Sequence, residues 1–183
     1  MAAGAASGSR SGRHQYPNFM NDEKTEIADW LRDAHAMESN LVHMLEGQVE
    51  RLSDFPELQR AVSEHAEESR RHAQWLEDAL KSLGQDTSML KEGIARLSGM
   101  LGPLGIGMAS DAPVKIVLAN YAAEHFEIAC YRSLKSAAEL LGFPGIAQIC
   151  GRILEDEERM AALLEPAIQR VTKSHLSRVS AAH

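Results

Sequence analysis

Residues 121–131 read YAAEHFEIACY, and this stretch places a carboxylate where a helix should bury an apolar side chain. Steps of four, three, four and three residues, the spacing of a core-facing helical stripe, connect Val117, Tyr121, Glu124, Ile128 and Tyr131. Glu124 therefore occupies a position that periodicity assigns to the core. An ionised carboxylate there is costly unless it is neutralised, paired with a cation or bound to a metal.

The composition predicts one soluble and mainly helical domain. The chain has 183 residues, of which 44% are hydrophobic, 25% charged and only 5% aromatic. This length suits a single domain with a real core, and the scarcity of aromatic residues favours helices over strands. The formal net charge of -7 argues against a nucleic-acid partner, because phosphate backbones are bound mainly by clustered Lys and Arg.

Targeting signals are not evident in the sequence. No apolar run approaches the roughly 20 residues that span a bilayer, and the N-terminal stretch lacks the apolar segment of a secretory signal. We therefore expect a cytoplasmic protein with no membrane partner, and we interpret the Ala/Gly/Ser-rich residues 1–21 as a disordered tail. Cys130 and Cys150 lack the CxxC spacing of a metal site and are expected to be buried thiols.

Hydrophobic periodicity and helix-ending residues predict four long helices. These helices are expected at residues 22–52, 56–83, 112–141 and 144–171. Gly84 and Gly142 should stop the second and third, residues 89–100 should form a short apolar helix inside a long crossover, and residues 173–183 should fray. Two antiparallel hairpins joined by a long crossover are the layout of an all-α, ferritin-like four-helix bundle, which we place at residues 22–172.

Each expected helix carries one glutamate near its middle, within its apolar stripe. These residues are Glu38, Glu68, Glu124 and Glu157. Antiparallel helices meet at their midpoints, so the four carboxylates should converge at one level of the bundle. Chance explains one such glutamate easily but explains four in register poorly. Because no Lys or Arg lies at that level within the stripes, a bound metal is the economical explanation.

Further candidate ligands lie one helical turn from these glutamates. His65 and His72 flank Glu68, and Glu127 follows Glu124. The expected metal ligands are therefore Glu38, His65, Glu68, His72, Glu124, Glu127 and Glu157. Carboxylates with one or two imidazoles suit Fe or Mn better than the metals that prefer thiolates, although Mg or no metal stays open. Tyr131 is expected mainly to pack in the core, but a tyrosine beside a metal can orient a carboxylate.

The motifs also resemble a known family, the bacterial ferritin-like stress proteins of the YciF/YciE type, which are classed as a domain of unknown function. The matching segments are LRDAHAMESNL (31–41), HAEESRRHAQWLE (65–77), EHFEIACYRSLKSAAELLG (124–142) and ILEDEERMAALL (153–164). The resemblance implies a ferritin-like bundle with an extra short helix in the crossover, a homodimer, and a role in the general stress response. It also implies a dinuclear site like that of rubrerythrin.

The sequence departs from the ferritin pattern at points that bear on this site. Arg71 stands three residues after Glu68, and Met160 stands three residues after Glu157, so neither glutamate is followed by the usual Glu-x-x-His. This departure favours a lopsided or single-metal site over a symmetric di-iron site. Only His65 or His72 could then supply the nitrogen ligands.

Two functions from different classes remain in competition. The first is a metal-dependent oxidoreductase in which two Fe or Mn ions inside the bundle reduce peroxide or oxidise Fe(II). The second is a non-catalytic stress or interaction protein that keeps the bundle without a functional metal site, its carboxylates protonated or hydrogen-bonded. A large storage cage is a third and weaker reading, because nothing in the sequence specifies a large assembly.

Overall fold

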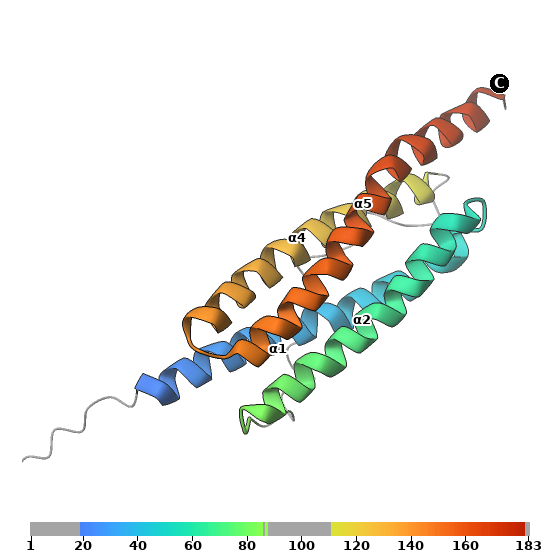
Figure 1. Cartoon of the computed structure of the whole chain (residues 1–183). Coiled ribbons are helices and arrows are strands. Elements are labelled where there is room, and N and C mark those ends of the chain that lie inside the picture. The colour runs from blue at the N-terminus through green and yellow to red at the C-terminus, as the bar shows by residue number, and fades with distance from the viewer. Residues whose placement is uncertain (1–18, 86, 88–110, 182–183) are drawn as a thin grey trace, which may run out of the picture.

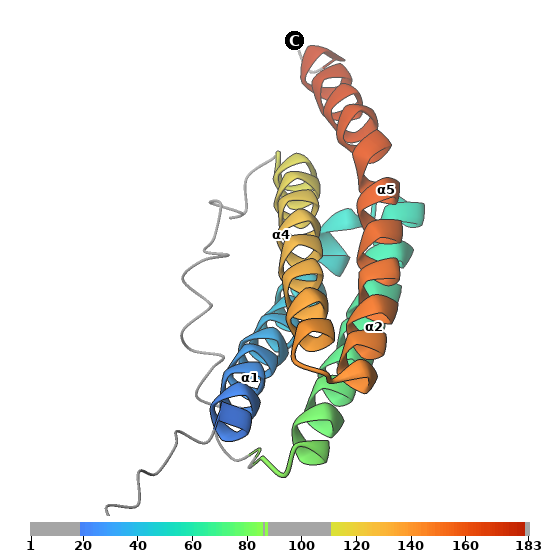
Figure 2. The same ribbon diagram turned by 60° about the vertical axis from the view of Figure 1, so that its left-hand side comes forward.

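The computed structural model describes residues 19–85, 87 and 111–181, which form two antiparallel helix hairpins (Figure 1). Helix α1 (Phe19–Glu46) pairs with α2 (Pro56–Ser82), and α4 (Ala112–Leu140) pairs with α5 (Pro144–Ala181). Figure 2 shows the same arrangement from a second direction. The described residues contain no strand. The all-α four-helix bundle expected from the sequence is therefore confirmed.

The apolar core lies in two parts with a polar layer between them. One part includes Ile27, Leu31, Leu76, Leu80, Leu134, Ile146 and Ile153. The other includes Leu41, Leu45, Leu58, Val62, Ile116, Leu164 and Val171. Along α1 the first part ends at Met37 and the second begins at Leu41, with buried Glu38 between them. The same interruption on the other three long helices makes the polar layer continuous across the bundle.

The glycines expected to stop two helices do so through left-handed backbone conformations. Gly84 has φ +70° after α2, and Gly142 has φ +77° between α4 and α5. The amide of Phe143 donates to the carbonyl of Ala138 at 2.8 Å, closing the end of α4 as in a Schellman motif. A residue with a Cβ is strained at such φ values, which explains why glycine occupies both positions.

The first helix ends earlier than expected. The sequence predicts one helix over residues 22–52, but α1 begins at Phe19 and ends at Glu46, and the 3-10 helix η1 (Val49–Leu52) follows. Gly47 is a poor helix former and marks the break. The carbonyl of Val49 accepts a hydrogen bond from the side chain of Gln59 on α2 at 2.9 Å, so the separate turn is tied to the neighbouring helix.

The last helix ends later than expected. The expected end near residue 171 is wrong, because α5 continues to Ala181 and includes Pro166, so most of the segment 173–183 is helical rather than frayed. Arg178 pairs with Asp54 and lies over the ring of Phe55, 5.6 Å from its centroid. These contacts with the turn before α2 give the extension a partner that periodicity alone does not reveal.

Two sequence expectations concern parts of the chain outside the described residues. The short helix at residues 89–100 lies wholly outside them, and so does nearly all of the tail at residues 1–21. Across the ranges that the structure does describe, no helix has the length and apolar character that crossing a membrane requires.

Candidate metal centre

The polar layer is built from buried side chains of all four long helices. Its members are Glu38 from α1, His65 and His72 from α2, Glu124 and Glu127 from α4, and Glu157 from α5. Each of them is at most 1% exposed. Six of the seven expected ligands are therefore brought together at one level of the bundle, and Glu68 is the exception.

These side chains form two groups that could each hold a metal ion. The first group is His65, Glu124, Glu127 and Glu157, and the second is Glu38, His72 and Glu157. Within each group, the potential ligand atoms lie within 4.8 Å of one another. Glu157 belongs to both groups, so the two positions are adjacent and share a carboxylate.

The two oxygens of Glu157 face different histidines. Its Oε2 lies 3.3 Å from Nε2 of His65, and its Oε1 lies 3.1 Å from Nδ1 of His72. His65 Nε2 is also 3.3 Å from Oε1 of Glu124, and His72 Nδ1 is 3.4 Å from Oε1 of Glu38. A carboxylate placed in this way can bridge two cations.

Each imidazole turns its other nitrogen to a carboxylate at the rim of the layer. Nδ1 of His65 lies 3.3 Å from Oε2 of Glu68, and Nε2 of His72 lies 3.1 Å from Oδ2 of Asp156. An ionised carboxylate can only accept a hydrogen bond, so these ring nitrogens carry the protons. His65 Nε2 and His72 Nδ1 are then available to a metal, the arrangement that orients histidine ligands in many metal sites.

Glu68 is placed differently from the sequence expectation. Its carboxylate does not belong to either ligand group, and its side chain is 23% exposed. It pairs with His65 on one side and with Nη2 of Arg159, at 2.8 Å, on the other. Hydrogen bonding to His65 lowers the pKa of Glu68, so this residue remains a carboxylate that positions the histidine.

Tyr131 reaches the same layer from α4. Its hydroxyl donates a hydrogen bond to Oε1 of Glu38, and its ring is fully buried beside the apolar residues of the core. Burial and the adjacent Glu38 raise the pKa of Tyr131 well above its usual range, so the phenol keeps its proton. The residue both packs and orients a carboxylate.

The layer contains many buried polar atoms without hydrogen-bond partners. Both carboxylate oxygens of Glu124, Glu127 and Glu157 lack one, and so do His65 Nε2 and His72 Nδ1. Leaving such groups unpaired in a core is costly, and ionised carboxylates need a cation close by. The unpaired atoms all belong to carboxylates and imidazoles, the donor set that suits Fe or Mn. The residues present therefore fit a dinuclear site.

Protons can partly neutralise the layer when no metal is bound. Burial opposes a charge on His72, but the attraction of the nearby carboxylates of Glu157 and Glu38 outweighs burial and raises its pKa to about 10. Burial raises the pKa of Glu124 to about 8 and that of Glu127 well above its usual range. For Glu157, the attraction of the two adjacent imidazoles, 3.3 and 3.1 Å away, overcomes the effect of burial and lowers the pKa to about 2. Metal binding at this layer must displace protons.

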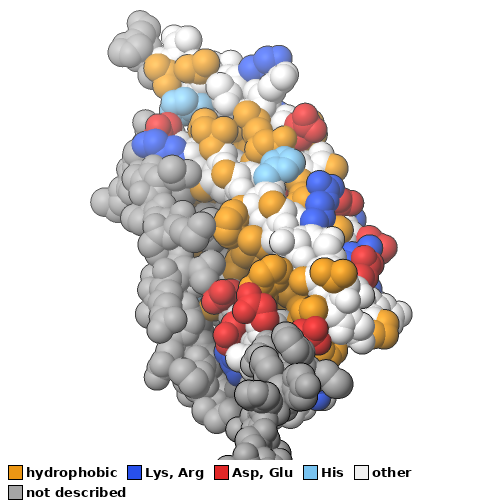
Figure 3. Space-filling view, turned by 90° about the vertical axis from the view of Figure 1, so that its left-hand side faces the viewer, with side chains coloured by type: hydrophobic (Ala, Val, Ile, Leu, Met, Phe, Trp, Pro, Cys, Tyr) orange, Lys and Arg blue, Asp and Glu red, His pale blue; other side chains and the backbone are white. Residues whose placement is uncertain are grey.

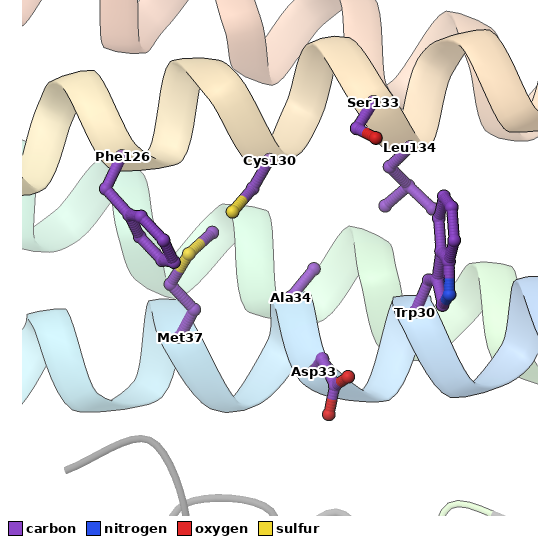
Figure 4. Close-up of a pocket in the computed structure, with 8 residues that line it drawn as sticks. All are labelled: Trp30, Asp33, Ala34, Met37, Phe126, Cys130, Ser133 and Leu134. Carbon is purple, nitrogen blue, oxygen red and sulfur yellow. The ribbon is translucent and has the colours of Figure 1, made fainter. Parts of the chain in front are cut away.

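An apolar groove lies between α1 and α4 (Figure 4), and two of its lining residues, Met37 and Phe126, are next in sequence to Glu38 and Glu127 of the polar layer. Its volume is about 350 Å³, and its lining includes Trp30, Met37, Phe126 and Cys130. Among the described residues that line it, Asp33 alone is charged, and none of the six side chains of the polar layer reaches it. Figure 3 shows hydrophobic side chains collected along the middle of one face of the molecule.

Sequence reasoning missed the residues that support the histidines from α5. Asp156 and Arg159 flank Glu157 but point to the rim of the layer, where their side chains are 22% and 57% exposed. They pair with each other at 2.7 Å. A charged pair three residues apart on a helix is common on any solvated face, so the sequence holds no signal for this role.

Comparison with known proteins agrees with the fold. The family model described as a domain of unknown function (DUF892) matches residues 25–177. A protein from Xanthomonas campestris of known structure is 30% identical, with 87% of this chain and 99% of that chain covered and a TM-score of 0.72.

Two further solved structures share the fold at lower identity. The bacterioferritin of Desulfovibrio desulfuricans, described with its diiron site in different catalytic states, is 22% identical over 88% of each chain, with a TM-score of 0.70. The E. coli stress protein YciF is 20% identical, with 82% of this chain and 97% of that chain covered and a TM-score of 0.63.

Proposed function

This chain belongs to the DUF892 family, as its resemblance to the YciF/YciE type predicts, and on that premise we propose that it is a stress-response protein with a dinuclear Fe or Mn site. His65, Glu124, Glu127 and Glu157 would hold one ion. Glu38, His72 and Glu157 would hold the other. The likeness to a bacterioferritin with a diiron site supports the proposal at the level of the fold.

The observation that carries this proposal is the position of Glu157 between two histidines. Its two oxygens lie 3.3 Å from His65 Nε2 and 3.1 Å from His72 Nδ1, and both oxygens lack hydrogen-bond partners. A carboxylate with a purely structural role would be satisfied by hydrogen bonds. Glu157 instead has the placement of a bridging ligand.

Fe or Mn bound at this layer would supply a change of oxidation state, the chemistry needed to reduce peroxide or to oxidise Fe(II). The chain's own residues hold the site dry, because apolar side chains cover the layer on both sides. Glu68 and Asp156 fix the two imidazoles, and Tyr131 fixes Glu38. We propose peroxide reduction or Fe(II) oxidation as the activity.

A metal titration with a matched pair of variants tests the proposal. Protein stripped with a chelator is titrated anaerobically with Fe(II) or Mn(II), and the parent should bind two equivalents. Glu157→Gln should lose the second ion and bind the first with lower affinity, because the carboxylate shared by the two positions is removed. Glu158→Gln is the control, since Glu158 lies next in sequence but is exposed and pairs with Arg132 on the surface. Equal binding by both variants would refute the bridge.

A non-catalytic protein is the second candidate, and the protonation of the layer favours it. The raised pKa values of His72 and Glu124 show that protons can offset part of the buried charge without a metal. A parent protein that binds no Fe or Mn, and whose thermal midpoint ignores both, would select this alternative. Metal-loaded protein that consumes neither peroxide nor Fe(II) would limit the first candidate to metal binding.

The homodimer and the cytoplasmic location remain predictions. The first rests on the family resemblance and the second on the sequence. Sedimentation of the purified protein would distinguish a dimer from a monomer or a large cage.

A further inference from the structure

One arginine connects the two carboxylates that face the histidines. Nη2 of Arg159 donates to Oε1 of Glu68 at 2.8 Å, and Nη1 donates to Oδ1 of Asp156 at 2.7 Å. The second oxygen of each carboxylate faces a ring nitrogen, Glu68 Oε2 toward His65 and Asp156 Oδ2 toward His72. A continuous chain of polar contacts therefore runs from one imidazole to the other through a single guanidinium.

The chemistry of each partner suits this arrangement. The guanidinium is planar and rigid, and it offers separate N–H groups to separate acceptors. Each carboxylate uses one oxygen for Arg159 and the other for its histidine, so rotation of either carboxylate would break a contact. This series of polar contacts also joins α2, which carries both histidines and Glu68, to α5, which carries Asp156 and Arg159.

A contribution of these surface ion pairs to folding stability does not explain the arrangement well. The side chain of Arg159 is 57% exposed, and exposed ion pairs contribute little to folding. Arg71, the other cation near Glu68, is 3.8 Å from its Oε1 and is too distant for a hydrogen bond. Among the contacts of the described residues, only Arg159 touches both rim carboxylates.

We propose that Arg159 is a positioning residue that sets the orientation of His65 and His72 together and so couples the two metal positions. The inference rests on the proposed function for its metal readout, but the orientation of the imidazoles can be measured without metal. Glu68 carries the effect to the position held by His65, and Asp156 carries it to the position held by His72.

Metal affinity tests the coupling. In an anaerobic Mn(II) titration of the full chain, Glu68→Ala and Asp156→Ala should each weaken one of two equivalents by about 10–100-fold, the usual cost of losing a group that orients a metal ligand. Arg159→Ala should weaken both. Arg159→Lys should restore one equivalent at most, because an ammonium cannot reproduce the fork that spans two carboxylates.

Arg132→Ala provides the matched control. Arg132 has a similar exposure, 63%, and pairs with Glu158 on the surface away from the layer. This variant should bind both ions as the parent does. If Arg159→Ala and Arg132→Ala have the same two affinities, the coupling is overturned.

A metal-free measurement separates this inference from the proposed function. Long-range proton–nitrogen spectra of the metal-free protein report the ring nitrogens, and Arg159→Ala should shift His65 Nδ1 and His72 Nε2 while leaving exposed His43 unchanged. If the parent binds no metal but both signals shift, the metal site fails and the positioning role survives. If the parent binds two ions and neither signal shifts, the positioning role fails and the metal site survives.

Discussion

The hydroxyl of Tyr131 donates a hydrogen bond to Glu38 across the bundle, although the two residues are 93 positions apart in the sequence. Both side chains are fully buried. The contact occupies Oε1 of Glu38 and leaves its Oε2 without a hydrogen-bond partner. It therefore fixes the carboxylate through Oε1, the oxygen that also lies 3.4 Å from Nδ1 of His72.

Tyr131→Phe should weaken the binding of the ion at Glu38 and His72 without abolishing it. The variant keeps the ring in the core but loses the hydrogen bond, so the metal-free protein should lose about 1 kcal/mol of unfolding free energy. Affinity for one equivalent should fall by about 10-fold or more. Tyr121→Phe is the control, because the ring of Tyr121 packs edge-on against His125, which is not a member of the polar layer. Unchanged affinities in Tyr131→Phe would contradict the orienting role.

Glu124 and Glu68 should respond differently to the same substitution. Glu124→Ala removes a member of the first ligand group, so the protein should retain one equivalent of Mn(II) at most. Glu68→Ala removes only the support of His65 and should retain two equivalents with one of them weakened. Elemental analysis after dialysis against a fixed Mn(II) concentration measures the difference. Complete metal loss in Glu68→Ala with full retention in Glu124→Ala would reverse the assignment.

The metal-free protein should lose stability as pH rises from about 5 to 9. The pKa of His72 is raised from 6.5 to about 10 on folding, and that of Glu124 from 4.5 to about 8. The folded state therefore binds more protons than the unfolded state in this range, and the unfolding free energy falls as those protons leave. Urea midpoints measured in chelator across this range check the direction. A midpoint that rises steadily from pH 5 to pH 9 would contradict it.

The pH dependence below this range should have the opposite sign. The pKa of Glu157 is lowered from 4.5 to about 2, so its contribution is present above pH 4.5 and is lost as pH falls toward 2. Metal affinity should rise with pH throughout, because ions compete with protons for the same atoms. The stabilisation by added Mn(II) should accordingly be larger at pH 8 than at pH 6.

Two neighbouring glycines should give opposite effects when replaced by alanine. Gly142 has φ +77°, so Gly142→Ala should cost about 1 kcal/mol of unfolding free energy from backbone strain. Gly145 lies inside α5 with open space where a Cβ would stand, so Gly145→Ala should be neutral or stabilising by up to about 1 kcal/mol. Urea unfolding measures both. Equal effects would mean that the turn does not require its left-handed residue.

Helical periodicity was a better guide to the burial of residues than to their role as ligands. Glu38, Glu124 and Glu157 lie in apolar stripes and are buried as expected. A step of seven residues returns to within about 20° of the same direction on a helix, so His65 and His72 point into the layer together. Glu68, three residues after His65, points about 60° to the side and reaches the rim instead.

Contacts between helices could not be read from the sequence. The pairing of Asp156 with His72 and of Arg159 with Glu68 depends on how α2 and α5 are rotated against each other. That rotation is set by the packing of the whole core rather than by either helix. Both imidazoles of the layer come from α2, in line with the absence of Glu-x-x-His motifs after Glu68 and Glu157, and the lopsided metal site itself stays a prediction. That absence did not reveal that α2 supplies one imidazole to each position.

The most direct test is a crystal structure of the Mn(II)-loaded protein with anomalous diffraction data collected at the manganese edge. Two anomalous peaks should lie in the polar layer, one on each side of Glu157, with His65 bound through Nε2 and His72 bound through Nδ1. A layer without peaks in crystals grown with saturating Mn(II), with Glu157 satisfied by hydrogen bonds, would contradict the dinuclear site.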